Sequence, residues 1–379
     1  MEGMNLPLPL SHPLWYLPVL MVGACIGSFL NVVIYRVPRD LSVNEPKRSF
    51  CPRCDYAIPM RLNLPMISWL MLRGKCANCG GRIAFRYFAV ELLTMLLFGA
   101  VWWAFGEQAP EVTPFLLLLM ALLIPITFID AEHLVIPLSM TWAGSVAGLL
   151  AAWVWPRLPA LGVAMAPDRT GGLVQSGLGW VIGFFGLWAV VLLGKLAFGR
   201  RKLAFPEQAD WSLREPESDE ETLNLVIGEE VISWWDMFYR KSDRLIIESS
   251  KLRVDGEEVD TGTLTIRETE VDLPDGRTLK IEQLNSLDGR AERVVIPREA
   301  MGMGDVHLMG MVGAFFGWAA VLFSLFAACI FAIVAAIFGR IGFGIRLPFG
   351  PFIALGALAW LFGGWMLWQA YLEMLGLGW

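Results

Sequence analysis

Charged side chains are scarce in this sequence. Asp, Glu, Lys and Arg make up 17% of its 379 residues, whereas soluble globular domains carry about 25%. Apolar residues make up 56%, and the mean hydropathy is +0.54. These values exclude an ordinary soluble globular protein and predict a polytopic membrane protein.

Positive charge is absent before the first apolar stretch, Leu14–Tyr35, which is 22 uncharged residues long. A secretory signal peptide carries a basic segment ahead of a shorter apolar region, so this class of segment is excluded. Because Arg36 and Arg39 follow the stretch, we expect it to stay in the membrane with its start outside. Gly23 and Gly27 form a face suited to close helix packing, and Asn31 is expected to bond a partner helix or to line a site.

The later apolar stretches predict an all-α membrane domain of eight transmembrane helices. The run Val306–Gly339 has 34 residues, too long for one crossing of about 20 residues. We expect Gly313 and Gly317 to break it into a hairpin of two short helices. The other spans are expected at Phe88–Phe105, Val112–Ile129, Leu134–Pro156, Gly171–Gly194 and Leu347–Tyr371.

Lys and Arg are unevenly divided among the expected loops. Of the 30, only Arg157 and Arg169 fall in loops expected outside. The loops 36–87, 195–305 and 340–346 hold the rest, so we expect them to face the cytoplasm.

Two carboxylates stand at membrane entries on that expected cytoplasmic side. Asp130 ends one apolar run, and Asp305 opens another in the motif Gly302-Met303-Gly304-Asp305. An ionisable group at such a place is costly and marks a functional site, and glycines allow a close approach to it. Two close carboxylates do not both ionise cheaply, so one can hold a proton while the other activates water, as in an aspartyl protease. The alternative is that both are helix caps or charges reaching to the membrane surface.

Six cysteines are present, and four of them form two Cys-x-x-Cys pairs separated by 21 residues: Cys51, Cys54, Cys76 and Cys79. This spacing predicts two knuckles that deliver four thiolates to one structural Zn²⁺. The alternatives are unrelated cysteines or a redox pair. The surrounding loop holds ten Lys and Arg, which favours contact with anionic lipid headgroups. Because the loop is tethered to the membrane at both ends, we expect no nucleic-acid partner.

The segment 203–300 is acidic, with 24 Asp and Glu against 12 Lys and Arg. Alternating apolar residues and the turn signals Asp255-Gly256 and Asp275-Gly276 predict a small β-rich soluble domain after an acidic linker, Glu215–Glu221. It is either a solvated structural insertion or an acidic surface that collects basic leader peptides or holds the domain off an anionic membrane.

Together these motifs resemble the type IV prepilin peptidase family of GxGD membrane aspartyl proteases. The resemblance rests on Gly27-Ser28-Phe29-Leu30-Asn31, the two cysteine pairs, Ile129-Asp130, Gly302-Met303-Gly304-Asp305 and Pro348-Phe349-Gly350-Pro351. It implies an inner-membrane enzyme that cuts basic leaders of type IV prepilins or type II secretion pseudopilins after a glycine. It also implies N-methylation of the new terminus with S-adenosylmethionine.

The resemblance implies that Asp130 and Asp305 are catalytic, supported by Gly302, Gly304, Glu132 and His307. Glu132 stands where a second Asp is usual, and His307 replaces a usual Lys. A Lys stays charged at neutral pH whereas a His titrates close to it, so the pH dependence is open.

No glycine-rich strand-turn-helix fingerprint is present, so sequence physics does not locate the methyl donor. The family associates methylation with the amino-terminal loop, where Arg73, Arg86 and Glu91 are candidates; Glu91 bonded to a neighbouring Arg is the structural alternative.

The expected domain division is 1–35, 36–87, 88–202, 203–300 and 301–379. Rival functions are a peptidase without methylation, a non-enzymatic scaffold and a transporter regulated by the zinc module. Transporters place ionisable groups near the membrane midplane in repeated halves. No internal repeat is apparent here.

Overall fold

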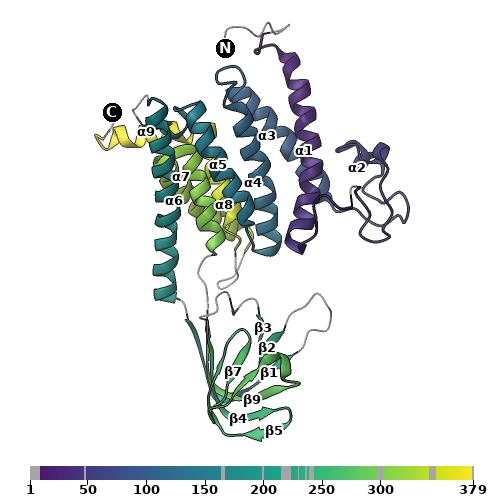
Figure 1. The fold of residues 1–379 in the computed structure, drawn as a ribbon, viewed down its shortest axis with the longest axis vertical. Coiled ribbons are helices and arrows are strands. Elements are labelled where there is room, and N and C mark those ends of the chain that lie inside the picture. Colours follow the sequence, from purple (N-terminus) through teal and green to yellow (C-terminus); the bar gives the residue numbers. More distant parts are fainter. Residues whose placement is uncertain are drawn as a thin grey trace. The chain divides into compact units, whose positions relative to one another are not determined.

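The computed structural model describes residues 9–46, 48–163, 167–198, 200–214, 223–228, 230–234, 237–238, 243–297, 302–340 and 347–377. The chain divides into two compact units (Figure 1). The first is helical and comprises Met1–Trp188 with Met303–Trp379, and the second is Ala189–Gly302. The expected acidic linker at 215–221 lies outside the described residues.

Long apolar helices build the first unit. They are α1 (Tyr16–Arg36), α3 (Phe85–Phe105), α4 (Thr113–His133), α5 (Leu138–Val154), α6 (Arg169–Phe198), α7 (Met303–Phe338), α8 (Gly350–Ala359) and α9 (Trp365–Met374). The part of α6 that follows Trp188 belongs to the second unit. Within the described part of the chain, six helical segments are long and apolar enough to cross a membrane, and α5 is a shorter apolar helix. The prediction of a polytopic membrane protein is confirmed.

Helices α1 and α3 pack closely because α1 presents glycines to α3. A Cβ added to Gly27 would lie 2.7 Å from the Cα of Glu91, and one added to Gly23 would lie 3.0 Å from the Cα of Met95. In a bilayer, burying apolar side chains contributes little to helix association. Helices associate instead mainly where small residues let their backbones pack closely. One turn further along α1, the side-chain amide of Asn31 donates a hydrogen bond to the carbonyl of Tyr87 at 2.9 Å and so links α1 to α3.

Helix α7 turns back on itself at Gly317. The backbone of Gly317 has φ 78° and ψ −179°, a conformation essentially restricted to glycine. A Cβ on Gly313 would lie 2.9 Å from Cγ2 of Val321, eight residues further on. Eight residues of a straight helix rise about 12 Å, so the two halves form the expected hairpin.

Further glycines on α5 and α6 seat this hairpin. A Cβ on Gly148 of α5 would meet the backbone of Ala314 at 2.8 Å, and one on Gly179 of α6 would meet the carbonyl oxygen of Gly313 at 2.2 Å. The hydroxyl of Ser176 donates to the carbonyl of Ala314. The first half of α7 is therefore fixed between α5 and α6.

The last helical stretch is interrupted. A π-helical turn, Trp360–Gly364, separates α8 from α9, and Gly363 within it has φ 127°. Figure 1 shows α9 turned away from the direction of α8. The expected continuous helix over Leu347–Tyr371 therefore consists of two helices joined at a glycine.

The second unit is an antiparallel sheet, which confirms the predicted β-rich domain. Its strand order is β3-β2-β1-β9-β4-β6-β7-β8, with β5 also paired to β4. The bounds are β1 (Arg200–Arg214), β2 (Asn224–Ile227), β3 (Glu230–Ser233), β4 (Leu245–Val254), β5 (Glu257–Val259), β6 (Gly262–Ile266), β7 (Glu270–Asp272), β8 (Thr278–Lys280) and β9 (Leu287–Pro297). At the predicted Asp255-Gly256 turn between β4 and β5, both residues have positive φ, as a tight hairpin requires.

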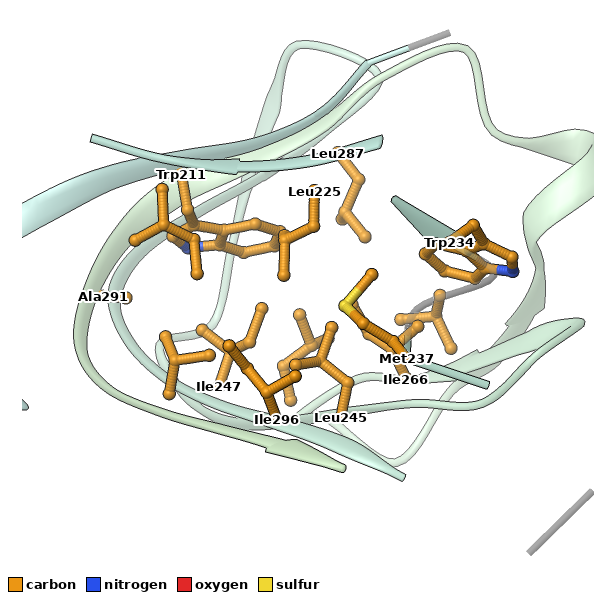
Figure 2. Packing of buried hydrophobic residues seen from close by; sticks show 14 of the residues in the cluster. Trp211, Leu225, Trp234, Met237, Leu245, Ile247, Ile266, Leu287, Ala291 and Ile296 are labelled. Carbon is orange, nitrogen blue, oxygen red and sulfur yellow. The ribbon is translucent and has the colours of Figure 1, made fainter. Parts of the chain in front are cut away.

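Alternation along the strands builds the core of this sheet. In β4 and β9, every second residue is buried over much of the strand. Figure 2 shows the buried side chains, among them Trp211, Leu245 and Ile247, pointing toward one another inside the curved sheet. The polar residues between them face outward, where the arginines pair with acidic neighbours, such as Arg290 with Asp210 and Arg253 with Asp288.

We expect Gly317→Ala to destabilise the folded protein by about 1–3 kcal/mol from backbone strain alone. The new Cβ would also lie 2.1 Å from the carbonyl oxygen of Pro159. Thermal unfolding of the purified full-length chain in detergent measures this effect. The matched control is Gly177→Ala in α6, where no atom lies within 4 Å of the new Cβ. An alanine at 317 that leaves Tm at the wild-type value would contradict the hairpin.

Candidate active site and metal centre

Asp130 lies in the last turn of α4, with only 5% of its surface exposed. Its Oδ2 accepts a hydrogen bond from the backbone N–H of Gly350, at 2.9 Å, where α8 begins. A Cβ on Gly350 would lie 2.8 Å from the same oxygen, so only glycine lets the backbone approach the carboxyl group this closely. The Pro348-Phe349-Gly350-Pro351 motif therefore has a physical role beside Asp130.

Asp305 lies in the first turn of α7, with 7% of its surface exposed. The preceding Gly304 packs against Ile136, because a Cβ at that position would lie 2.7 Å from the Cβ of Ile136. Gly302 precedes the helix and is exposed.

Ile136 brings the two carboxylates into one neighbourhood. It follows α4 in the short connection to α5, and it contacts both Gly304 and Gly350. A Cβ on Gly350 would lie 3.1 Å from Cδ1 of Ile136 and 2.8 Å from Oδ2 of Asp130. The ends of α4 and α7 that bear the two aspartates thus meet the start of α8 around one isoleucine. Sequence reasoning gave no role to Ile136, since a lone isoleucine carries no signal of its own.

Glu132 and Arg86 form an ion pair. The guanidinium of Arg86, at the start of α3, donates to both carboxylate oxygens of Glu132 at the end of α4. This pair ties the amino-terminal helices to the helix that carries Asp130. Arg86, a candidate for binding the methyl donor, is therefore engaged with a residue two positions from Asp130.

His307 lies among aromatic rings. Its ring centroid is 5.0 Å from Phe184 and 5.7 Å from Trp142, and Trp180 stacks on Phe184 at 5.2 Å. These rings pack around the imidazole, and aromatic faces attract a cation, so the cluster would also accommodate the ammonium group of a lysine. The sequence gave no indication of the cluster because its members come from α5, α6 and α7.

The four paired cysteines converge as predicted. Their sulfur atoms all lie within 4.8 Å of one another, and Sγ of Cys51 is 4.0 Å from Sγ of Cys79. Tetrahedral thiolate coordination at about 2.3 Å places sulfurs roughly 3.8 Å apart, so the donor set fits one metal ion. Each pair sits in a similar turn: the N–H of Asp55 donates to the carbonyl of Cys51, and the N–H of Gly80 donates to that of Cys76.

The turn around the second pair favours a thiolate. Backbone N–H groups of Cys79 and Asn78 lower the pKa of Cys76 to about 6. The N–H of Gly81 also lowers the pKa of Cys79, but its neighbouring thiols raise it to about 11. Four sulfurs this close do not all ionise without a cation between them, which is the electrostatic reason for a metal here.

Glu91 is buried in α3, and its Oε2 accepts from the backbone N–H of Met66 at 2.6 Å. Its partner is thus a backbone group of the cysteine loop rather than the neighbouring Arg considered from the sequence. Arg73 lies in a left-handed turn after the short helix α2 (Ile67–Met71), with φ 52°.

Arg36 is a structural residue that sequence reasoning missed. It is buried, and its guanidinium donates to the carbonyls of Ser42, Val43 and Pro46. From the sequence, Arg36 predicted only the orientation of α1 in the membrane. Its guanidinium also fixes the start of the cysteine loop.

Comparison with known proteins matches both halves of this arrangement. Residues 21–105 match the Bacterial Peptidase A24 N-terminal domain, and residues 286–337 match the Type IV leader peptidase family. A prepilin leader peptidase/N-methyltransferase of Dichelobacter nodosus is 34% identical, over 52% of this chain and 72% of that protein. The corresponding Neisseria gonorrhoeae protein is 35% identical, over 53% and 71%. This chain belongs to the prepilin leader peptidase/N-methyltransferase family.

Other family members match smaller portions. The Myxococcus xanthus prepilin leader peptidase/N-methyltransferase is 48% identical over 141 residues, which is 37% of this chain and 41% of that protein. No solved structure matches the chain. The two matched family regions contain the cysteine pairs and Asp305, whereas Asp130 lies between them.

We expect the cysteine cluster to bind one metal ion with an affinity that rises with pH. Between pH about 6 and about 11, Cys76 is a thiolate and Cys79 a thiol, so metal binding displaces at least the Cys79 proton. The apparent affinity should therefore fall at least about tenfold for each pH unit lost, and more steeply below about 6, where Cys76 also protonates.

Competition with a chromophoric chelator at several pH values measures this dependence on the full-length protein. Cys76→Ser should lose the metal, and Cys25→Ser in α1 is the matched control that should keep it. An affinity that does not change with pH would contradict the assignment.

Proposed function

We propose that this chain is a bifunctional prepilin leader peptidase/N-methyltransferase. It cleaves the basic leader of type IV prepilins or type II secretion pseudopilins after a glycine, and it then methylates the exposed α-amine. Family membership supports both activities. The observation that carries the peptidase proposal is the placement of two buried carboxylates, Asp130 and Asp305, on helix ends that pack around Ile136.

The two aspartates are the catalytic pair in this proposal. Burial disfavours two neighbouring negative charges, so the pair retains one proton. The ionised carboxylate takes a proton from water, which attacks the peptide carbonyl, and the protonated carboxyl donates to the carbonyl oxygen. The Gly350 N–H fixes Asp130, and Gly304 lets Ile136 pack against the start of α7 beside Asp305. The exposed Gly302, which has no side chain, leaves room there for the substrate backbone. Glu132 and His307 are supporting residues.

The methyltransferase uses S-adenosylmethionine. When bound, this donor would supply an electrophilic methyl group to the neutral terminal amine, with the C–S electron pair left on sulfur and the amine proton released to water. The chain's own part is to hold the cleaved terminus and the donor together. Arg86 is not free for this task, because Glu132 neutralises it.

We further propose eight membrane crossings in the bacterial inner membrane. Counting α7 as two helices that meet at Gly317, with α5 as a short span and α8–α9 as one, gives this number. The amino terminus lies outside, and the active site faces the cytoplasm, since the Lys and Arg-rich loops lie on that side. The bound metal is a structural Zn²⁺, which four thiolates favour. The domains divide as 1–35, 36–87, 88–202, 203–300 and 301–379, and the basic cysteine loop contacts anionic lipid.

A transporter is the candidate from another class. Transport sites lie near the membrane midplane in broken helices. Asp130 and Asp305 lie instead in the last turn of α4 and the first turn of α7, and this favours a protease at the membrane surface.

We expect Asp130→Asn and Asp305→Asn each to lower prepilin cleavage at least about 1,000-fold, because general acid and base catalysis both disappear. Neither change should prevent methylation of a pilin supplied already cleaved. Membranes bearing each variant, incubated with a prepilin and labelled methyl donor, report the two activities separately. Glu107→Gln, at an exposed site outside the pair, is the control. Normal cleavage by either variant would exclude the aspartate pair.

We expect His307→Lys to preserve cleavage, because the rings of Trp142 and Phe184 accommodate an ammonium group as they do an imidazole. His307→Leu, which removes the titratable imidazole and keeps an apolar fit, is the comparison variant and should lower kcat. The measurement is kcat across the pH range. A folded lysine variant without activity would show that His307 has a role beyond tuning charge.

A further inference from the structure

A cavity of about 350 Å³ lies between α1, α3 and the cysteine loop. Its lining comes from both helices and both knuckles, including Asn31, Glu91 and Tyr87 on the helices and Phe50, Trp69 and Cys76 in the loop. A volume in this range suits a small ligand or cofactor, and the lining is predominantly apolar and aromatic as such sites usually are. The aspartate pair and His307 do not line it.

Polar atoms in this cavity lack partners. Asn31 is 3% exposed; its amide nitrogen donates to the carbonyls of Tyr87 and Gly27, which fixes its carboxamide oxygen as the free acceptor. Within the described chain, that oxygen accepts no hydrogen bond, and the buried indole N–H of Trp69 donates none. An unsatisfied buried polar atom costs about 1–3 kcal/mol. A ligand that carries both a donor and an acceptor would satisfy both atoms.

Glu91 adds a carboxyl group to the same wall. Its surroundings are apolar, and its Oε2 accepts from the N–H of Met66, which anchors the cysteine loop to α3. Among the described residues, no cationic side chain pairs with Glu91, so a ligand that brings a positive charge would stabilise its ionised form. Three arginines line the cavity, and none of them forms an ion pair with Glu91 in the described structure: Arg36 donates to three backbone carbonyls, and Arg53 and Arg82 are exposed.

These features select a ligand with a flat heteroaromatic part, a donor and an acceptor on that part, and a positive charge. We propose that this cavity is the binding site of S-adenosylmethionine. Asn31 and Trp69 recognise the amino group and a ring nitrogen of adenine, the aromatic lining holds the ring, and Glu91 complements the sulfonium charge. This inference rests on the proposed methyltransferase function and assigns it a site.

The arrangement also relates the metal centre to methylation. Cys51 and Cys76 line the cavity, so the metal-bound knuckles form one of its walls. The Arg86–Glu132 ion pair joins the start of α3, beside the cavity, to the end of α4 that bears Asp130. Cleavage and methylation therefore take place at the same end of the helical unit, at separate sites.

Binding of S-adenosylhomocysteine to the full-length protein in detergent, measured by calorimetry, tests this site without turnover. We expect Glu91→Gln to raise Kd about tenfold or more, because it removes the charge while a glutamine oxygen still accepts from Met66. Trp69→Phe should raise Kd about fivefold by loss of one hydrogen bond while its packing on Phe85 and Phe88 persists. Zinc content should be unchanged in both, which shows that the cysteine loop stays folded.

The matched controls are Glu107→Gln and Trp103→Phe, both at exposed positions away from the cavity and expected to bind as the wild type does. Ultraviolet crosslinking of labelled S-adenosylmethionine, followed by peptide mapping, should label residues of the cavity wall. Unchanged Kd in both cavity variants, a label elsewhere, or a phospholipid in the cavity that the ligand does not displace would overturn the proposal. Absence of methylation by the wild type would instead overturn the proposed function.

Discussion

The burial of two carboxylates at helix ends is the constraint on which the helical unit depends. A carboxylate away from water needs hydrogen bonds and close packing. Here the backbone supplies them: a glycine N–H reaches Asp130, and glycines at 304 and 350 let three helix ends close around Ile136. Replacing either glycine with a larger residue would push an atom into Ile136 or Asp130 itself. The close packing around the two aspartates therefore requires glycine at both positions.

The same principle operates throughout the helical unit. Glycines at 23 and 27 seat α1 on α3, and those at 148 and 179 seat the first half of α7 between α5 and α6. In a bilayer, an apolar side chain gains little free energy by moving from lipid to a protein contact. Close packing between helix backbones therefore stabilises this unit, whereas the hydrophobic effect stabilises a soluble core. The sheet domain shows the contrast, since its core consists of large residues such as Trp211 and Leu245.

Much of this arrangement was predictable because it depends on local patterns. Apolar length predicted the helices, Gly317 predicted the reversal in α7, and cysteine spacing predicted the sulfur cluster. The turn at Asp255-Gly256 was predictable because only some residues tolerate positive φ. The contacts of Ile136, the ion pair of Arg86 with Glu132 and the aromatic rings around His307 were not, because their members come from distant segments. The break at Gly363 was missed since the apolar run continues through it.

The pairing of β1 with β9 has a consequence for how the sheet domain joins the chain. Arg200 and Pro297 are register partners, so the first and last residues of the sheet lie side by side across a hydrogen-bonded ladder. A module whose two ends adjoin can be spliced into a short connection between helices without spanning a new distance. Such a module can be added, removed or replaced without moving the helices on which the two aspartates depend.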